Sequence, residues 1–299
     1  MSSAISSARK RLVRTVGAAS CVREPLRFCG RELSGRRRTE AYRLRGSELR
    51  AMIRHPLLDL WVLEEIFRKR AYALPAAVEQ RLRSLGRALR VLDLGGHVGL
   101  FGLWFLSLFD DARVTSFEPD PGNAAVLRRC VAANGLAASW EVIEAAASNS
   151  DGTASFLSEF QLSQIGDDPS ALGPEREGLE QIFPFLAGRP LMKPRPVTVA
   201  TRDVLPDLRE CDFLKLDIQG GEWDLLTDPR FGQLSATALV IEVHPQGCPA
   251  GDHVALAAER LENAGFSLEP PVPAHGVEWV IWATRWTGAA AKSPAPPVS

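Results

Sequence analysis

Apolar positions along this chain change their spacing in a regular way, so that short strands alternate with helices. Short apolar runs, which fit buried strands, occupy 91–94, 114–117, 140–146, 197–199, 212–217 and 238–244. Apolar residues at helical spacing occupy 100–109, 123–134, 222–226 and 254–264. This alternation predicts an α/β fold: a doubly wound, mostly parallel sheet with helices on both faces. The last two runs, 266–268 and 277–283, predict an antiparallel pair at one edge.

The segment between the first strand and the first helix of this pattern is rich in glycine. It reads Asp93-Leu-Gly95-Gly96-His97-Val-Gly99. Glycines let the backbone turn tightly and approach a ligand at the start of the following helix. Glu118 follows the next strand, nineteen positions after Gly99. Dinucleotide folds place there the acid that accepts hydrogen bonds from a ribose diol.

The order of residues in this loop separates two cofactor classes. A dinucleotide loop spaces its glycines as G-x-G-x-x-G and holds a pyrophosphate. Here Asp93 precedes the first glycine by two residues. A carboxylate at that position repels pyrophosphate but suits the ammonium group of an amino acid. The loop therefore favours S-adenosylmethionine over NAD, and an NAD-dependent oxidoreductase remains the alternative enzyme class.

Further polar groups follow the other predicted strands. In open α/β sheets, ligands bind at the carboxyl ends of the strands. The side chains expected on this one rim are Asp93, Glu118, Asp217, Glu242 and His244. Small residues around Ala145, at the end of the third strand, leave room for an adenine ring.

Four motifs in order resemble the FkbM-type methyltransferases: Asp-Leu-Gly-Gly-His-Val-Gly, Phe-Glu-Pro-Asp-Pro, Leu-Lys-Leu-Asp-Ile-Gln-Gly-Gly-Glu and Ile-Glu-Val-His. The lead-in from Asp59 to Tyr72 is also similar to that family, and the resemblance covers 55–285. It implies a class I (Rossmann-like), S-adenosylmethionine-dependent methyltransferase, often an O-methyltransferase acting on natural products or sugars. Gln219 departs from the family pattern, in which a Glu is common. We expect the cofactor to contact Tyr72, Asp93, Gly95, Gly96, His97, Gly99, Glu118, Pro119 and Ala145.

Methyl transfer to a hydroxyl needs a well-placed nucleophile and a group that takes its proton. His244 is the predicted base, and the alternative is a histidine that only hydrogen-bonds Glu242 or the lid. Asp217 is the second catalytic candidate, because it can orient the hydroxyl or His244. Asp217 and Glu242 could also hold a divalent ion, but two carboxylates without a third ligand do not favour a metal. Glu222 is expected to cap its helix, and His97 to act through packing or its backbone.

Charge and composition narrow the remaining choices. The chain has 299 residues and a net charge of −1, which gives no general attraction to nucleic acid or membrane. No apolar run reaches the length of a membrane helix. Five scattered cysteines without CxxC pairs fit a reducing compartment, so we expect a cytoplasmic protein.

Residues 1–50 carry thirteen Lys or Arg against four Glu. We interpret them as a solvated or partly disordered arm, although residues 1–23 also have the composition of a transit peptide. Few aromatic residues accompany these arginines, which argues against nucleic-acid binding. The predicted organisation is a basic arm and helical cap (1–88), a cofactor domain (89–286) and a disordered tail (287–299). A long Pro- and Gly-rich segment, 158–194, is interpreted as a lid over the substrate.

These features predict an enzyme that methylates a hydroxyl of a small-molecule natural product or sugar. Carboxyl methylation, N-methylation and a non-catalytic cofactor-binding subunit are the alternatives, and an RNA methyltransferase would need a basic face near the rim. A homodimer is left open.

Overall fold

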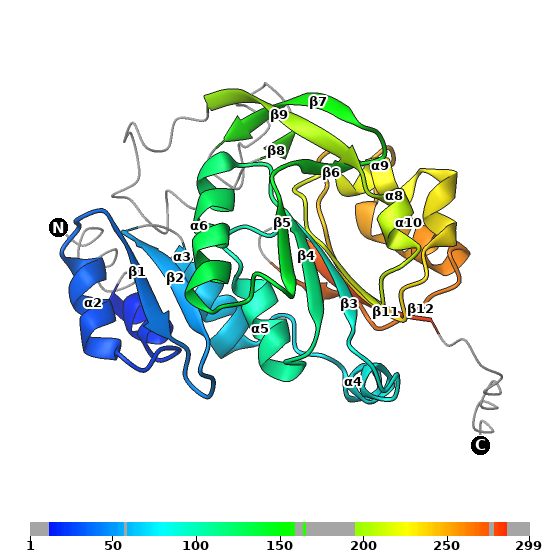
Figure 1. Cartoon of the computed structure of the whole chain (residues 1–299). Helices are drawn as coiled ribbons and strands as arrows, with labels where there is room; N and C mark the ends of the chain where they lie inside the picture. Colours follow the sequence, from blue (N-terminus) through cyan, green and yellow to red (C-terminus); the bar gives the residue numbers. More distant parts are fainter. Residues whose placement is uncertain (1–11, 57–58, 159–163, 166–194, 275–277, 286–299) are drawn as a thin grey trace, which may run out of the picture.

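A single large sheet organises the molecule. The computed structural model describes residues 12–56, 59–158, 164–165, 195–274 and 278–285. The sheet has the order β12-β14-β11-β10-β3-β4-β5, with β13 paired to β14 (Figure 1). Its parallel strands are β3 (Arg90–Leu94), β4 (Arg113–Phe117), β5 (Trp140–Ile143), β10 (Phe213–Leu216) and β11 (Ala238–Val243). The antiparallel edge consists of β12 (Ser267–Leu268), β13 (Val272–Pro273) and β14 (Trp279–Thr284). The predicted mostly parallel sheet with an antiparallel edge is confirmed.

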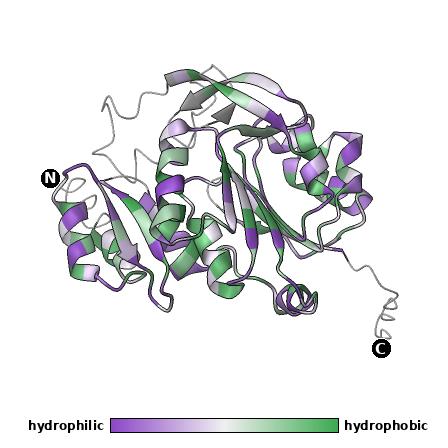
Figure 2. Ribbon diagram, in the orientation of Figure 1, coloured by the Kyte–Doolittle hydropathy of each residue, from purple (hydrophilic) through white to green (hydrophobic). Residues whose placement is uncertain are grey.

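Alternate residues of the central strands enter two separate hydrophobic cores, one on each face of the sheet. Val91 and Phe213 belong to one cluster, whereas Leu92 and Leu214 belong to the other. The first core includes residues of α5 (Leu100–Leu108) and α6 (Pro121–Ala133). The second includes residues of α8 (Leu205–Leu208), α9 (Glu222–Leu226), the 3₁₀ turn Pro229–Gln233 and α10 (His253–Asn263). Figure 2 shows the apolar strands between these layers, as expected for strands that are buried on both faces.

The strand order reverses at the centre of the sheet. β3, the first strand of the sheet in sequence, pairs with β4 on one side and with β10 on the other. The loops after β3 and β10 therefore meet at the position where such folds bind their ligands. Gly95 has a φ of +90°, and a Cβ there would lie 1.8 Å from the Asp217 carbonyl oxygen. Glycine at this position thus allows close approach of the two strand ends.

The region after β5 differs from the prediction. The expected strand 140–146 is divided, because β5 ends at Ile143 and Ala146–Ser148 forms β6 in a second sheet. That sheet has the order β6-β9-β7-β8, with β7 (Gly152–Ser158), β8 (Gln164–Ile165) and β9 (Arg195–Asp203). β6 and β7 are not paired with each other, since β9 lies between them. Thr201–Asp203 form the end of β9 and pair with β6.

The N-terminal region is folded from residue 12 onward, so the interpretation of 12–50 as a solvated arm is wrong. A helical segment at 12–19 is followed by α2 (Pro25–Leu33) and the antiparallel pair β1 (Arg38–Arg43) and β2 (Arg50–His55). Phe28 and Tyr42 have no exposed surface, and their rings pack against His55. The excess of basic side chains in this segment suggested disorder. Burial of these aromatic rings stabilises a folded structure in spite of that charge.

Three further elements complete this region: α3 (Asp59–Leu63), a π-helical turn at Glu64–Lys69 and α4 (Ala76–Arg83). Ile53 and Leu63 belong to the same hydrophobic cluster as Leu103 and Phe105 of α5. The region therefore packs on the α5–α6 face of the large sheet, as Figure 1 shows. It contains a β-hairpin as well as the predicted helices.

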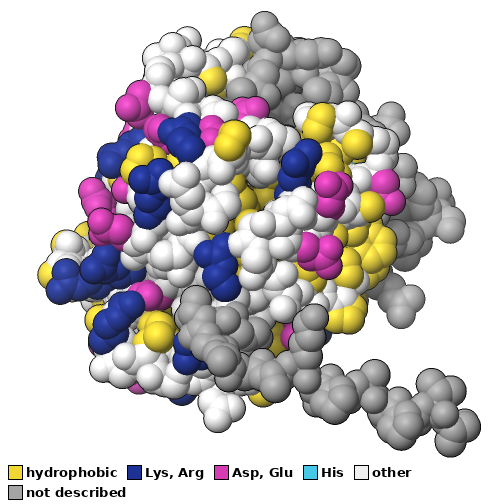
Figure 3. Space-filling view, turned by 90° about the vertical axis from the view of Figure 1, so that its right-hand side faces the viewer, with side chains coloured by type: hydrophobic (Ala, Val, Ile, Leu, Met, Phe, Trp, Pro, Cys, Tyr) yellow, Lys and Arg dark blue, Asp and Glu magenta, His cyan; other side chains and the backbone are white. Residues whose placement is uncertain are grey.

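Other sequence predictions fall outside the described residues. These are most of the proposed lid at 158–194 and the tail at 287–299. No described helix is both long enough and apolar enough to cross a membrane. Figure 3 views the α10 side of the molecule, where acidic and basic side chains are interspersed.

Candidate active site

Glu118 joins the glycine loop to the end of β4. Its Oε2 accepts a hydrogen bond from the His97 backbone N–H at 2.7 Å, and its Oε1 accepts one from the Asp120 N–H at 2.9 Å. The Asn123 side chain donates to Oε1 at 3.3 Å. A carboxylate has about four acceptor positions, so acceptor capacity remains for a ligand hydroxyl.

Electrostatics at this carboxyl group suit a neutral polar ligand. Burial raises the pKa of Glu118 to about 7, against the opposing effect of the backbone donors. Burial likewise lowers the pKa of His97 to about 4, so the imidazole is neutral at neutral pH. His97 adopts a positive φ of 47° within the loop, and its Nδ1 is buried without a hydrogen bond in the described structure.

A buried arginine ties the N-terminal region to this loop. Arg54, at the end of β2, makes a bidentate pair with Asp59, with Nη2–Oδ1 at 2.7 Å and Nε–Oδ2 at 2.9 Å. Its Nη2 lies 3.2 Å from His97 Nε2, and its Nη1 donates to Asn123 at 2.8 Å. Burial opposes the charge of Asp59, but Arg54 outweighs it and lowers the pKa of Asp59. Arg54 thus contacts both the loop histidine and a partner of Glu118.

Asp93 has a different environment from the one expected. Its side chain is fully buried, Ser116 donates to Oδ2 at 2.8 Å, and Lys215 Nζ lies 3.4 Å from Oδ1. Burial raises the pKa of Asp93 despite Lys215. A cation from the protein thus already lies beside the carboxylate that we expected to face the cofactor ammonium. The direct contact with cofactor stays a prediction, and the geometry weighs against it.

Lys215 is a central residue that the sequence reasoning missed. Its Nζ donates to the Gly95 carbonyl at 2.6 Å and lies 3.2 Å from Asp217 Oδ2. Burial opposes its charge, but Asp217 and Asp93 outweigh burial and raise the pKa of Lys215. The sequence signal that could have revealed it is a single lysine within the apolar strand 212–217. In the structure this lysine lies opposite Asp93 in the parallel register. A buried lysine requires carboxylate partners.

Asp217 and Glu242 lie together under the Tyr72 hydroxyl. Tyr72 Oη donates to Glu242 Oε2 at 3.2 Å and lies 3.5 Å from Asp217 Oδ2. Burial opposes the charge of Asp217, but Lys215 lowers the pKa of Asp217 so that it stays ionised. Burial and then Asp217 raise the pKa of Glu242. Tyr72, predicted to bind cofactor, thus lies with the predicted catalytic Asp217 and with Glu242, which was considered as a metal ligand.

His244 is fully buried and both of its ring nitrogens are engaged. Nδ1 lies 3.0 Å from Glu222 Oε1, and Nε2 lies 3.0 Å from Gln219 Nε2. Burial disfavours protonation, but Glu222, with Glu242 and Asp217, outweighs it and raises the pKa of His244 well above its ordinary value. A charged imidazole has no lone pair to accept a proton, and a neutral one has its Nε2 lone pair directed at Gln219. Neither state favours the predicted role of His244 as a free base.

Glu222 stabilises the turn after β10. Its Oε1 accepts from the Ile218 N–H and its Oε2 from the Gly220 N–H, both at 2.8 Å. Glu222 thus binds amides of the turn before its helix and also orients His244. Sequence reasoning expected a helix cap and did not connect the two residues.

Several other predicted cofactor residues line the same edge. Gly96 and Gly99 pack against Ser116 and Leu127 respectively, where a Cβ would lie within 2.9 Å and 2.5 Å of side-chain atoms. Pro119 is partly exposed beside Glu118, and Ala145 is buried between β5 and β6. No ligand tests these assignments, which stay predictions.

The polar groups at this edge fit S-adenosylmethionine. The Glu118 carboxylate, which follows the second strand, suits the hydroxyls of a ribose, and the loop at the switch point is the expected place for the nucleoside. Asp217, Glu242 and Tyr72 form a second polar group across Lys215 from the loop.

Comparison with known proteins agrees with this architecture. The Methyltransferase FkbM domain matches residues 93–268, more than half of the chain. No curated protein matches the chain.

Similar solved structures are methyltransferases. They include precorrin-6y C5,15-methyltransferase from Geobacter metallireducens GS-15, with 15% identity, 71% of this chain and 87% of that chain covered, and a TM-score of 0.39. Methyltransferase FkbM from Methylobacillus flagellatus KT has 15% identity, 65% and 43% coverage, and a TM-score of 0.41. A SAM-dependent methyltransferase from Agrobacterium tumefaciens has 14% identity, 82% and 70% coverage, and a TM-score of 0.42. The match thus spans less than half the length of the Methylobacillus protein.

The matched range begins at Asp93 and includes the glycine loop, Glu118, Asp217 and His244. The chain therefore belongs to the FkbM methyltransferase family and is an S-adenosylmethionine-dependent methyltransferase with the class I fold.

Proposed function

We propose that this enzyme methylates an oxygen atom of a small molecule, most simply a hydroxyl of a natural product or sugar. The observation that carries the proposal is the position of Asp217. Its side chain is 21% exposed and lies at the end of β10, beside the glycine loop. A carboxylate there can accept a hydrogen bond from a hydroxyl and direct the oxygen lone pair toward the cofactor.

The acceptor end of the site is built to keep Asp217 charged. Lys215 lies 3.2 Å from Oδ2, and Gln219 donates to Oδ1 at 3.1 Å. The cofactor supplies an electrophilic methyl group. As the new C–O bond forms, the hydroxyl becomes strongly acidic, so even a weakly basic carboxylate can take its proton.

The same charges bear on the alternative acceptors. A carboxylate acceptor would be repelled by Asp217 and Glu242, which argues against carboxyl methylation. An amine would be attracted as an ammonium ion, but it must lose a proton before it can attack. N-methylation is therefore the second candidate.

A transfer assay with deuterated-methyl S-adenosylmethionine tests the proposal. Hydroxyl, amine and carboxylate compounds are offered in one panel, and the labelled atom is located by mass spectrometry and NMR. We expect label on oxygen, and Asp217→Asn should lower kcat by about 10²–10⁴-fold while cofactor affinity changes little.

The matched control is Asp224→Asn, because Asp224 is exposed on α9. Label found only on nitrogen, or an Asp217→Asn variant as active as the Asp224 variant, would contradict the proposal.

A further inference from the structure

Three ligand-forming side chains lie on one face at the end of β11 and the start of β14. In this antiparallel pair, Glu242 is opposite Val280 and Val243 is opposite Trp279. Continuing the register by one residue places Glu278 opposite His244. Because side chains alternate between faces along a strand, Glu242, His244 and Glu278 lie on the same face.

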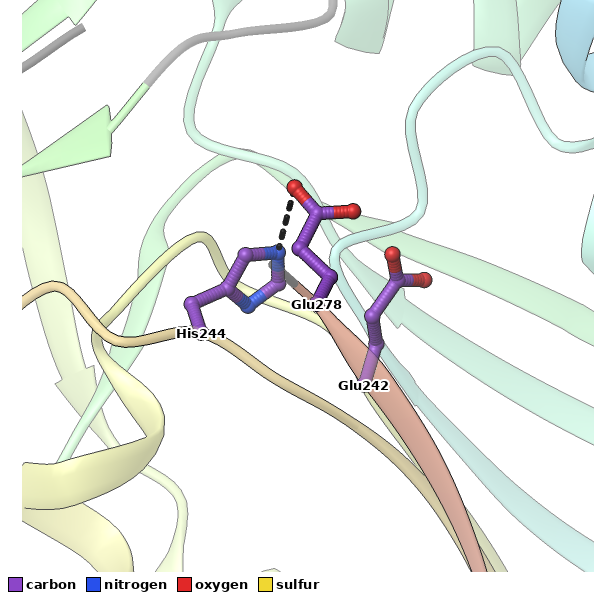
Figure 4. A group of neighbouring side chains, drawn as sticks. All are labelled: Glu242, His244 and Glu278. Carbon is purple, nitrogen blue, oxygen red and sulfur yellow. Dashed lines mark ion pairs between the residues drawn. The ribbon is translucent and has the colours of Figure 1, made fainter. Parts of the chain in front are cut away.

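The side chains converge as this register requires. One potential ligand atom from each of Glu242, His244 and Glu278 lies within 4.8 Å of the others. His244 Nε2 is 3.8 Å from Glu278 Oε1. Figure 4 shows both carboxyl groups on the Nε2 side of the imidazole.

An independent observation concerns the second ring nitrogen of His244, Nδ1. His244 Nδ1 lies 3.0 Å from Glu222 Oε1, and backbone amides hold both Glu222 oxygens. A carboxylate behind Nδ1 fixes the tautomer and directs the Nε2 lone pair outward, as it does for histidines that bind metals. Glu222 thus supplies the supporting group that an isolated acidic cluster lacks.

We propose that Glu242, His244 and Glu278 bind one divalent transition-metal cation. Metal–ligand distances of about 2.0–2.2 Å allow two ligand atoms to lie up to about 4.2 Å apart, so the side chains need to close by less than about 1 Å. The cation displaces the Gln219 amide from Nε2. One imidazole and two carboxylates suit manganese, iron, cobalt or zinc better than magnesium or calcium, which prefer oxygen ligands alone.

This site differs from the pair considered from sequence. The sequence offered no third ligand for Asp217 and Glu242. Glu278 is distant from Glu242 in sequence, and the sequence alone does not reveal the strand register that brings the two residues together. The binding claim does not depend on the methyl acceptor, because it concerns the three side chains alone.

Cobalt binding tests the proposal without any methyl transfer. Full-length protein is treated with a chelator, exchanged into buffer and titrated with Co²⁺ by calorimetry and visible absorption, without cofactor or acceptor. We expect one equivalent to bind, with d–d bands of a nitrogen- and oxygen-ligated ion. Glu278→Gln should weaken binding by more than the roughly 10–100-fold cost of losing a supporting hydrogen bond.

Controls separate the site from surface binding and from misfolding. Glu269→Gln removes an exposed carboxylate near β12, and His253→Gln removes another histidine; both should bind Co²⁺ as the unmodified protein does. Circular dichroism and thermal melting verify that Glu278→Gln is folded. Absence of stoichiometric binding, or equal affinity in folded Glu278→Gln, would overturn the metal site while leaving oxygen methylation standing. Metal binding without methyl transfer to any oxygen would support the metal site and contradict oxygen methylation.

Discussion

At the scale of single residues, Glu118 is the predicted ribose-binding residue. Its buried carboxyl group receives hydrogen bonds from neutral donors in the loop and in α6. Hydroxyl groups of a ribose would extend this set, and the ionised carboxylate is the stronger acceptor.

Glu118→Ala should remove two charge-assisted hydrogen bonds to the ribose. We expect a loss of about 2–4 kcal/mol in cofactor binding, measured by titration calorimetry. The matched control is Glu144→Ala, since Glu144 is a partly exposed acid paired with Arg128. An unchanged dissociation constant in the Glu118 variant would refute the assignment.

The same carboxyl group predicts a pH dependence. Because the pKa of Glu118 is raised to about 7, the carboxylate is lost as pH falls through that value. Cofactor affinity should level off above about pH 7 and decrease by up to about tenfold per unit below it. Glu118→Gln should remove this slope. A slope that persists in Glu118→Gln would assign the pH dependence to another group.

Residue types explain why parts of the site could be predicted and others could not. Glu118 and Asp217 follow apolar strands, so the rule for parallel sheets places them on one rim. Lys215 lies inside a strand, and its role depends on the register with Asp93. Tyr72 is remote in sequence from both carboxylates that it contacts, and no local pattern reveals that contact.

At the scale of secondary-structure elements, the connection between β2 and the glycine loop is the least expected feature. Arg54 and Asp59 form a buried pair whose arginine reaches His97 and Asn123. Removal of one partner leaves the other charge buried and uncompensated.

Asp59→Asn should therefore destabilise the protein by about 3–5 kcal/mol in urea unfolding and weaken cofactor binding. The control is Glu210→Gln, which breaks the exposed pair with Arg90 and should cost no more than about 1 kcal/mol. Equal stability of the two variants would show that the buried pair does not support the loop.

The close approach of two strand ends gives another prediction. Gly95→Ala would place a Cβ against the Asp217 carbonyl and force a positive φ on alanine, so we expect severe loss of stability. Gly30→Ala, in α2, has open space around it and should be neutral or stabilising by up to about 1 kcal/mol. Thermal melting of both variants tests the difference. A Gly95→Ala protein with the same melting temperature as the Gly30→Ala protein would contradict the observed packing.

At the scale of the whole molecule, periodicity predicted the large sheet because its buried strands are short, mostly apolar runs. It failed where pairing is long-range: β6 and β7 are separated by β9, which begins more than thirty residues after β7 ends. Composition was misleading at residues 12–50. It suggested disorder, but Phe28 and Tyr42 form a core with His55. Burial of a few aromatic rings is invisible to charge counting.

The central claim is that the glycine loop and Glu118 together bind S-adenosylmethionine. A crystal structure of the protein with S-adenosylhomocysteine tests it most directly. We predict both ribose hydroxyls within hydrogen-bond distance of Glu118 and the sulfur directed toward Asp217. A ribose bound elsewhere, with Glu118 still contacting only His97, Asp120 and Asn123, would contradict the account.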